Sequence, residues 1–149
     1  MLKVLDRKER KSFLDMLESQ FGFNEKLDYI FFINGKNKIY IANKELSTID
    51  LSKLRINSVG MYIAELRKDV ARLSIEGSQL IGPKATKNVV ELQDAEAREW
   101  MKGKDLDNTW DVQGFVIIKR DGDYLGCGRA TKDKILNFVS KARRLNVSD

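Results

Sequence analysis

The pattern of apolar and polar positions predicts a helix over residues 7–21. Apolar side chains recur there at spacings that place them on one helical face, with charged residues opposite. These apolar residues are Phe13, Leu14, Leu17 and Phe21. Asp6 can cap the N-terminus together with Glu9, because this spacing matches a capping box. Gly22 suits the C-terminal end of the helix.

Strand-forming runs follow, and the first two predict a β-hairpin. Residues 27–33 are rich in aromatic and β-branched side chains, residues 38–42 repeat the pattern, and Asn34-Gly35 between them is a turn signal. A short helix is expected within residues 44–54. Further short strands are expected at 58–66, 70–73, 88–92, 112–119, 124–130 and 135–139.

A second amphipathic segment predicts a helix over residues 94–101, with Asp94 as its N-cap and Gly103 as its stop signal. Residues 120–123 predict the turn of another hairpin. The expected content of two or three helices and about eight strands indicates an α+β fold. A change of composition near residues 74–77 suggests two parts.

We therefore predict an N-terminal α/β domain over residues 1–74 and a β-barrel over residues 75–149. The length of 149 residues is enough for one ordinary domain or two small ones. No apolar run approaches the roughly 20 residues that a membrane helix needs, and the first residues lack the apolar core of a signal peptide. The single cysteine can form no internal disulfide. These features favour a cytoplasmic protein with no membrane partner.

The charge balance favours an anionic partner such as nucleic acid. The net charge is +5, and the sequence pI is about 9.3. Residues 93–111 hold six acids and three bases, whereas residues 112–148 hold eight bases and three acids. If these bases gather on one rim of the barrel, they can contact a phosphate backbone. The alternative is an ordinary solvated surface.

The candidate RNA-binding residues are these bases together with two lysines beside the only proline. They are Lys84, Lys87, Lys119, Arg120, Arg129, Lys132, Lys134, Lys141, Arg143 and Arg144. The aromatic residues Trp110, Tyr124 and Phe138 are interleaved with them, and stacking on RNA bases is one possible use. We expect all three to lie in the core instead, and Trp100 with them.

Catalytic chemistry is largely missing from the sequence. The chain has no histidine, which removes the commonest general base and metal ligand. Cys127 has no histidine to activate it, so we expect a buried structural thiol. The glycines of Gly126-Cys127-Gly128 indicate a tight bend in a small barrel better than a nucleotide loop. We therefore expect no enzymatic activity, no metal and no cofactor.

Several segments of the C-terminal half resemble a known family, the RNA cytosine-5 methyltransferases that act on ribosomal RNA. The segments are 81–92 with its Gly-Pro-Lys, 114–118, 125–130 with its Leu-Gly-x-Gly, and 136–137 with Leu-Asn. They resemble the PUA-like region at the C-terminus of these enzymes, and the likeness runs from about residue 58 to 145. The N-terminal layout, with residues 59–66 as a VGxYIAEL-like strand, is similar to that of small ribosome-biogenesis factors of the large subunit.

The resemblance implies a PUA-like mixed β-barrel that binds structured RNA through the face beside the Leu-Gly-x-Gly strand. It points to Lys84, Lys119 and Arg129 as the best contacts, whereas Cys127 stands where the family often has a large residue. The Rossmann-type catalytic domain of the methyltransferases has no counterpart in this sequence. The resemblance therefore implies an RNA-targeting module without its enzyme.

Two functions follow as expectations. The first is a non-enzymatic protein that binds structured rRNA or tRNA in ribosome biogenesis or RNA modification. The second is an adaptor that docks a partner RNA methyltransferase or pre-ribosomal proteins. The adaptor would leave Tyr29, Phe31 and Phe32 of the first hairpin partly exposed, because exposed apolar patches mark interaction surfaces.

Overall fold

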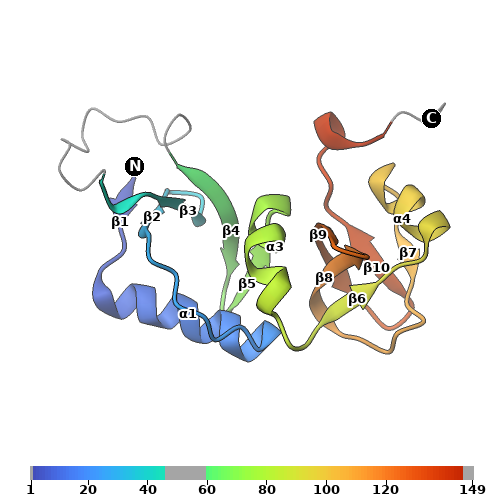
Figure 1. Ribbon diagram of the computed structural model, residues 1–149, viewed down its shortest axis with the longest axis horizontal. Helices are drawn as coiled ribbons and strands as arrows, with labels where there is room; N and C mark the ends of the chain where they lie inside the picture. Colours follow the sequence, from blue (N-terminus) through green and yellow to red (C-terminus); the bar gives the residue numbers. More distant parts are fainter. Residues whose placement is uncertain (1, 46–59, 146–149) are drawn as a thin grey trace.

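The computed structural model describes residues 2–45 and 60–145. In this part of the chain the fold consists of two five-stranded sheets with helices packed beside and between them (Figure 1). This arrangement confirms the α+β class. The helix expected within residues 44–54 and the first residues of the strand expected at 58–66 lie largely outside the described residues.

The N-terminal sheet is an antiparallel meander in the order β1-β2-β3-β4-β5, so each strand pairs with its neighbour along the chain. The predicted hairpin over 27–42 is present, and the strands expected at 58–66 and 70–73 pair with each other as a second hairpin in the described part of the chain. The strands are β1 Lys3–Val4, β2 Ile30–Ile33, β3 Lys38–Ala42, β4 Met61–Arg67 and β5 Val70–Leu73. The two-residue strand β1 was not predicted, since it is too short to show a periodic pattern.

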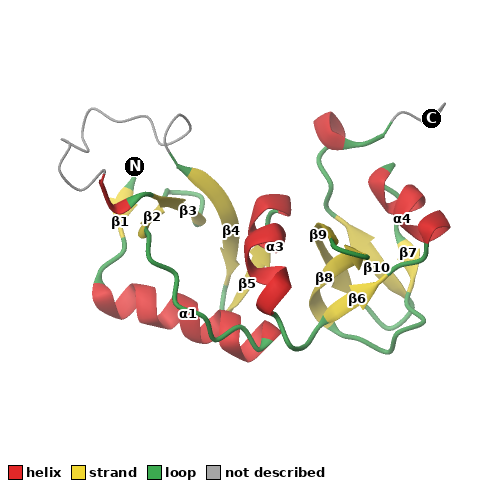
Figure 2. Cartoon of the chain, in the orientation of Figure 1, coloured by secondary structure: helices red, strands yellow, loops and turns green. Residues whose placement is uncertain are grey.

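Helix α1 (Arg7–Phe21) lies along this sheet (Figure 2) and confirms the prediction at both ends. The Asp6 side chain accepts a hydrogen bond from the Glu9 backbone, and the Glu9 side chain accepts one from the Asp6 backbone. Gly22 ends the helix with φ +64°, in the left-handed region that glycine adopts without a steric cost. The buried side chains of the helix are Phe13, Leu17 and Phe21.

The C-terminal sheet has the order β6-β8-β9-β10-β7, and it is mixed because β6 runs parallel to β8 while the other pairs are antiparallel. It curls into part of a barrel, in agreement with the predicted barrel. The strands are β6 Val89–Glu91, β7 Leu106–Asp107, β8 Gly114–Arg120, β9 Asp123–Ala130 and β10 Lys134–Asn137. Helix α4 (Asp94–Met101) packs against this sheet through the buried Trp100.

Two details of α4 and β7 correct the predictions. Helix α4 spans the predicted residues, but its N-cap is Gln93 and not Asp94. The Gln93 backbone N–H donates to Glu96 Oε1 at 2.8 Å. Asp94 is instead the first helical residue and pairs with Arg120. The short strand β7 was not predicted.

Helix α3 (Ile75–Ile81) lies between the two sheets (Figure 1). This helix was not predicted, because the sequence showed only a change of composition near residues 74–77. A 3₁₀ turn, η3 (Gly82–Lys84), continues it. Gly77 allows the helix to approach β4 closely, because a Cβ there would lie 2.0 Å from the Ile63 carbonyl oxygen. Ser74 caps the helix by accepting from the Gly77 backbone N–H.

One hydrophobic cluster joins the two halves of the molecule. It contains Phe13, Phe31 and Ile63 from the N-terminal half together with Ile117 and Cys127 from the C-terminal sheet. A second cluster around Trp100 lies within the C-terminal half.

The division after residue 74 stays a prediction. In the described part of the chain, no helix is long and apolar enough to cross a membrane.

Candidate nucleic-acid interface

The β8–β9 hairpin carries several of the predicted RNA-binding residues, but it places them at opposite ends. Lys119 pairs in register with Tyr124 near the turn, whereas Arg129 pairs with Phe115 at the far end. Lys119 and Phe115 are four residues apart, so about 13 Å of strand separates the two positions. The prediction that Lys119 and Arg129 share one rim is therefore wrong, because antiparallel pairing sends them apart.

Lys119 and the proline loop form the first of two groups of cations. The Lys119 Nζ lies 5.5 Å from the centre of the Tyr124 ring. That ring packs against Gly82 at the start of η3, which also carries Lys84. Both Lys84 and Lys87 are exposed. The family-based contacts Lys84 and Lys119 thus lie near each other, and Arg129 does not belong with them.

Three of the predicted cations are held by carboxylates from distant parts of the sequence. Arg120 Nε lies 2.6 Å from Asp94, Lys134 Nζ lies 2.6 Å from Asp107, and Arg143 pairs with Glu76. The hydrogen bonds from Arg120 and Lys134 lower the pKa values of their carboxyl partners. These cations therefore do not add to one continuous positive surface.

The remaining predicted cations lie in different places. Lys132 lines a shallow pocket together with Arg129 and Asp111. Arg144 donates from Nε to the Val139 carbonyl at 2.9 Å, which ties it to the backbone. Lys141 is exposed in the last 3₁₀ turn, η4 (Lys141–Arg143).

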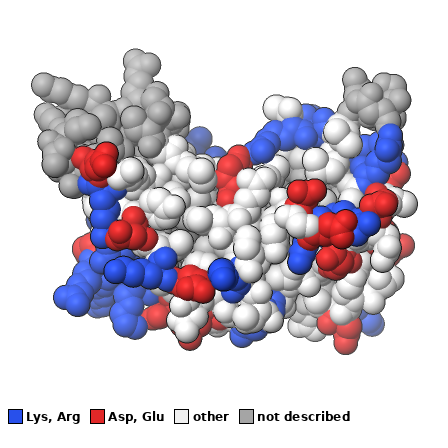
Figure 3. Space-filling view, viewed as in Figure 1, with Lys and Arg blue, Asp and Glu red and all other residues white. Residues whose placement is uncertain are grey.

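The view in Figure 3 shows the charge pattern directly. Acidic and basic side chains alternate over the C-terminal half, whereas Lys and Arg gather over the start of α1 at the lower left. The bases of that first helical turn and the next are Arg7, Lys8, Arg10 and Lys11. On this face, the gathering of Lys and Arg over the start of α1 therefore lies outside the last quarter of the sequence, where the excess of bases was noted.

Arg129 instead faces three cations from the N-terminal sheet. Arg67, Lys68 and Arg72 come from β4, β5 and the turn between them, and with Arg129 they line a groove of about 650 Å³. Arg67 and Arg72 also contact Glu65, at 2.6 Å and 3.6 Å. None of these three cations was predicted as a contact from the sequence. The only sequence signal was Arg67-Lys68 at a predicted turn.

Two aromatic rings lie in the same groove, which we call the cationic groove. Phe115 and Phe138 have ring centres 6.3 Å apart, and the Arg72 guanidinium lies 4.8 Å from the Phe138 ring. Phe138 is 40% exposed. The prediction that Phe138 lies in the core is wrong, because it follows the end of β10 and packs on Arg72 rather than inward. Trp110 and Tyr124 are half-buried.

A deeper cavity of about 330 Å³ adjoins this groove, and Arg72 and Phe138 line both. Its other walls include Tyr62 from β4, Glu76 from α3 and Arg143 from η4. Burial raises the pKa of the Tyr62 phenol, while the hydrogen bond to Arg72 opposes this rise. The cavity therefore brings together side chains from both halves of the molecule.

Comparison with known proteins agrees with this architecture. Residues 87–145 match the family model described as the methyltransferase RsmF PUA domain. The C-terminal half contains a PUA-like region. It is of the kind found in ribosomal RNA methyltransferases, as the resemblance in the sequence implied.

The similar curated proteins are named ribosomal RNA small subunit methyltransferase F. The chain is 38% identical over 93 residues to the protein of Aeromonas salmonicida, covering 60% of this chain and 19% of the relative. It is 30% identical over 141 residues to the protein of Aeromonas hydrophila, covering 92% of this chain and 28% of the relative. It is 28% identical over 106 residues to the protein of Vibrio cholerae, covering 70% of this chain and 22% of the relative. The chain thus spans less than a third of the length of these relatives.

The thiol in the PUA-like region is buried. Cys127 is buried where β9 meets the N-terminal half, and burial raises its pKa from 9.0 to about 12. This confirms the prediction of a structural thiol, because an activated cysteine needs a lowered pKa. Among the described residues, no group of three or more acidic, cysteine or histidine side chains could hold a metal ion.

The first hairpin does not offer the partner surface that the adaptor function requires. Phe31 and Phe32 are buried, and only Tyr29 is half-buried. Phe31 packs edge-on against Phe13 of α1, with ring centres 6.0 Å apart. The expectation of exposed rings is therefore wrong for Phe31 and Phe32. Helix α1 covers Phe31, whereas Phe32 points to the opposite face of β2 and is buried there.

Proposed function

We propose that the protein binds structured RNA through the cationic groove and acts in the modification or assembly of ribosomal RNA. The observation that carries this proposal is that Arg67, Lys68, Arg72 and Arg129 line one groove with two aromatic rings. One carboxylate, Glu65, pairs with two of these four cations, so a positive excess remains. Cations provide contacts to phosphates, and exposed rings provide stacking surfaces for unpaired bases. The PUA-like region and the names of the relatives favour rRNA over tRNA.

In this proposal the protein binds RNA without transforming it, in the cytoplasm. The sequence contains no histidine, and the one cysteine is buried with a raised pKa. Positioning a separate enzyme on the RNA, or stabilising an RNA structure during assembly, needs only binding. Mixing the protein with rRNA and a radiolabelled methyl donor tests this part, and methylation of the RNA would contradict it.

The groove itself is tested by salt-dependent binding of a structured rRNA fragment. For Arg129→Gln we expect weaker binding. We also expect the slope of log association constant against log salt concentration to become shallower by roughly 0.7 to 0.9, because one phosphate contact is lost. Fluorescence anisotropy over a range of salt concentrations measures both values.

Lys119→Gln is the matched control, because it removes the same charge from the other end of the same hairpin. We expect a smaller change in affinity for this variant. If Lys119→Gln weakens binding as much as Arg129→Gln does, the interface includes both ends of the hairpin and is not confined to the groove. If neither changes the slope, the groove does not contact phosphate.

A further inference from the structure

We infer that the cavity beside the cationic groove accepts one unpaired base of the bound RNA, and that it favours a base with an amino group. This inference rests on the proposed function. The cavity has a volume of about 330 Å³, which lies within the range of roughly 300–1,000 Å³ that small-molecule sites occupy. Its walls provide both a stacking surface and a polar edge, which are the two requirements for binding a base.

The stacking surface is the exposed ring of Phe138. Every base has a π-face, so an aromatic side chain can bind a base whatever its identity. Phe138 lines both the cavity and the groove, as does the Arg72 guanidinium that lies against its ring. A strand whose phosphates follow the groove therefore passes the mouth of the cavity, and one base can turn inward there.

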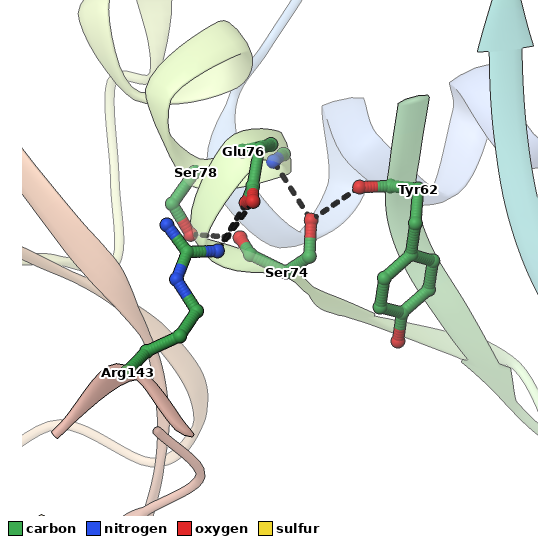
Figure 4. Close-up of polar contacts among 6 residues, drawn as sticks. Tyr62, Ser74, Glu76, Ser78 and Arg143 are labelled. Carbon is green, nitrogen blue, oxygen red and sulfur yellow. Dashed lines mark hydrogen bonds and ion pairs between the residues drawn. The ribbon is translucent and has the colours of Figure 1, made fainter. Parts of the chain in front are cut away.

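The polar edge consists of Glu76 and Arg143, which lie together across the cavity wall (Figure 4). Arg143 Nη1 donates to both carboxylate oxygens of Glu76, at 2.8 Å for Oε2. A carboxylate has about four acceptor positions, so Glu76 can still accept from a ligand. The side chains are 34% and 48% exposed for Glu76 and Arg143, and a ligand can reach them.

Two nearby hydroxyl groups, those of Ser74 and Ser78, are already hydrogen-bonded to the backbone. Ser74 Oγ donates to the Tyr62 carbonyl at 2.7 Å and accepts from the Gly77 N–H, and Ser78 Oγ donates to the Ser74 carbonyl at 2.8 Å (Figure 4). An exposed ion pair such as Glu76–Arg143 adds little stability by itself. It lines the cavity and is accessible to a ligand there.

The carboxylate sets the expected preference. Glu accepts hydrogen bonds from the amino group of cytosine, whereas uracil has a carbonyl oxygen at the same position. Cytosine and uracil have the same ring size, and oligomers of the two carry the same backbone charge. Any difference in affinity between them therefore reports contacts to the edge of the base.

The test measures binding of short single-stranded oligocytidylate and oligouridylate of equal length by fluorescence anisotropy. We expect tighter binding of oligocytidylate by the unchanged protein. Phe138→Leu keeps an apolar side chain but removes the ring, and it should weaken both oligomers about tenfold, with an unchanged salt slope. Glu76→Gln should remove most of the preference for cytosine. Val4→Ala, at an exposed apolar residue in β1, is the control.

The outcomes separate this inference from the proposed function. If Phe138→Leu and Glu76→Gln bind both oligomers as the unchanged protein does, while Arg129→Gln still weakens rRNA binding, the cavity does not accept a base and the groove assignment stands. If no RNA binds at all, both are wrong. Free cytidine monophosphate should bind far more weakly than the oligomer, and equal affinity would show a site for free nucleotide instead.

Discussion

At the scale of single residues, the glycines of β9 are explained by packing. A Cβ on Gly128 would lie 2.7 Å from both the Trp100 ring and the Ile135 side chain. Gly126 has φ +124°, a conformation that side chains rarely adopt. Trp100 in turn donates from Nε1 to the Leu125 carbonyl at 3.3 Å, which fixes its ring beneath this strand. Close packing therefore requires glycine at position 128, and the backbone conformation favours it at position 126.

Gly128→Ala tests this explanation. We expect a loss of roughly 1–3 kcal/mol in the free energy of unfolding, since extra volume in a packed core forces its neighbours to move. Urea denaturation followed by tryptophan fluorescence measures it. Gly122→Ala in the hairpin turn is the matched control, because its Cβ would meet no atom within 4 Å. Equal losses for the two variants would contradict the packing argument.

The charged residues show the limit of reading single positions from a sequence. Arg129 and Lys68 lie in one groove although 61 positions separate them in the chain, and no local pattern records that proximity. The same is true of Arg120, whose carboxylate partner Asp94 lies 26 positions away. Local charge counts therefore identified basic segments, but the fold decides which bases remain available for RNA.

At the scale of elements, local signals predicted α1 well and α3 not at all. The ends of α1 are defined by its own side chains, since Asp6 and Glu9 form the capping box. Helix α3 has only seven residues, with Gly77 and Ser78 in its middle. Isolated short helices are marginal in water. Packing against β4 and β9 stabilises α3, and β9 lies far along the chain from this helix.

Asp6→Ala should lower the free energy of unfolding by about 1 kcal/mol, because the cap satisfies backbone N–H groups at the helix N-terminus. Asp15→Ala serves as the comparison on the same helix. Asp15 makes only an exposed ion pair with Lys11 at 3.1 Å, which is worth a few tenths of a kcal/mol at most. Chemical denaturation followed by circular dichroism measures both, and a larger loss for Asp15→Ala would contradict the capping role.

At the scale of the whole molecule, the two sheets share a core. Ile117 and Cys127 of the C-terminal sheet are buried in the same cluster as Phe13 and Ile63. Hydrogen bonds add to this contact, because Asn88 Nδ2 donates to the Gln20 carbonyl at 2.5 Å. Separating the halves would expose these apolar side chains to water, at a cost that grows with the area exposed.

We therefore expect the full chain to unfold in one cooperative transition. Tryptophan fluorescence reports only the C-terminal half, since Trp100 and Trp110 both lie there, whereas circular dichroism reports the whole chain. The two probes should give coincident urea denaturation curves. A fragment of residues 75–149 should be less stable than the full chain. Separate transitions would instead support two independent domains divided after residue 74.

The strand order of the two sheets also has a consequence for synthesis on the ribosome. Every pairing of the N-terminal meander lies within residues 3–73, so these hydrogen bonds can form while the rest of the chain is still being translated. Part of its apolar surface is covered by side chains that are translated later, among them Ile117 and Cys127. The nascent sheet should therefore bind chaperones that capture apolar surface until β8 and β9 emerge, which crosslinking of translation-arrested chains of increasing length would reveal.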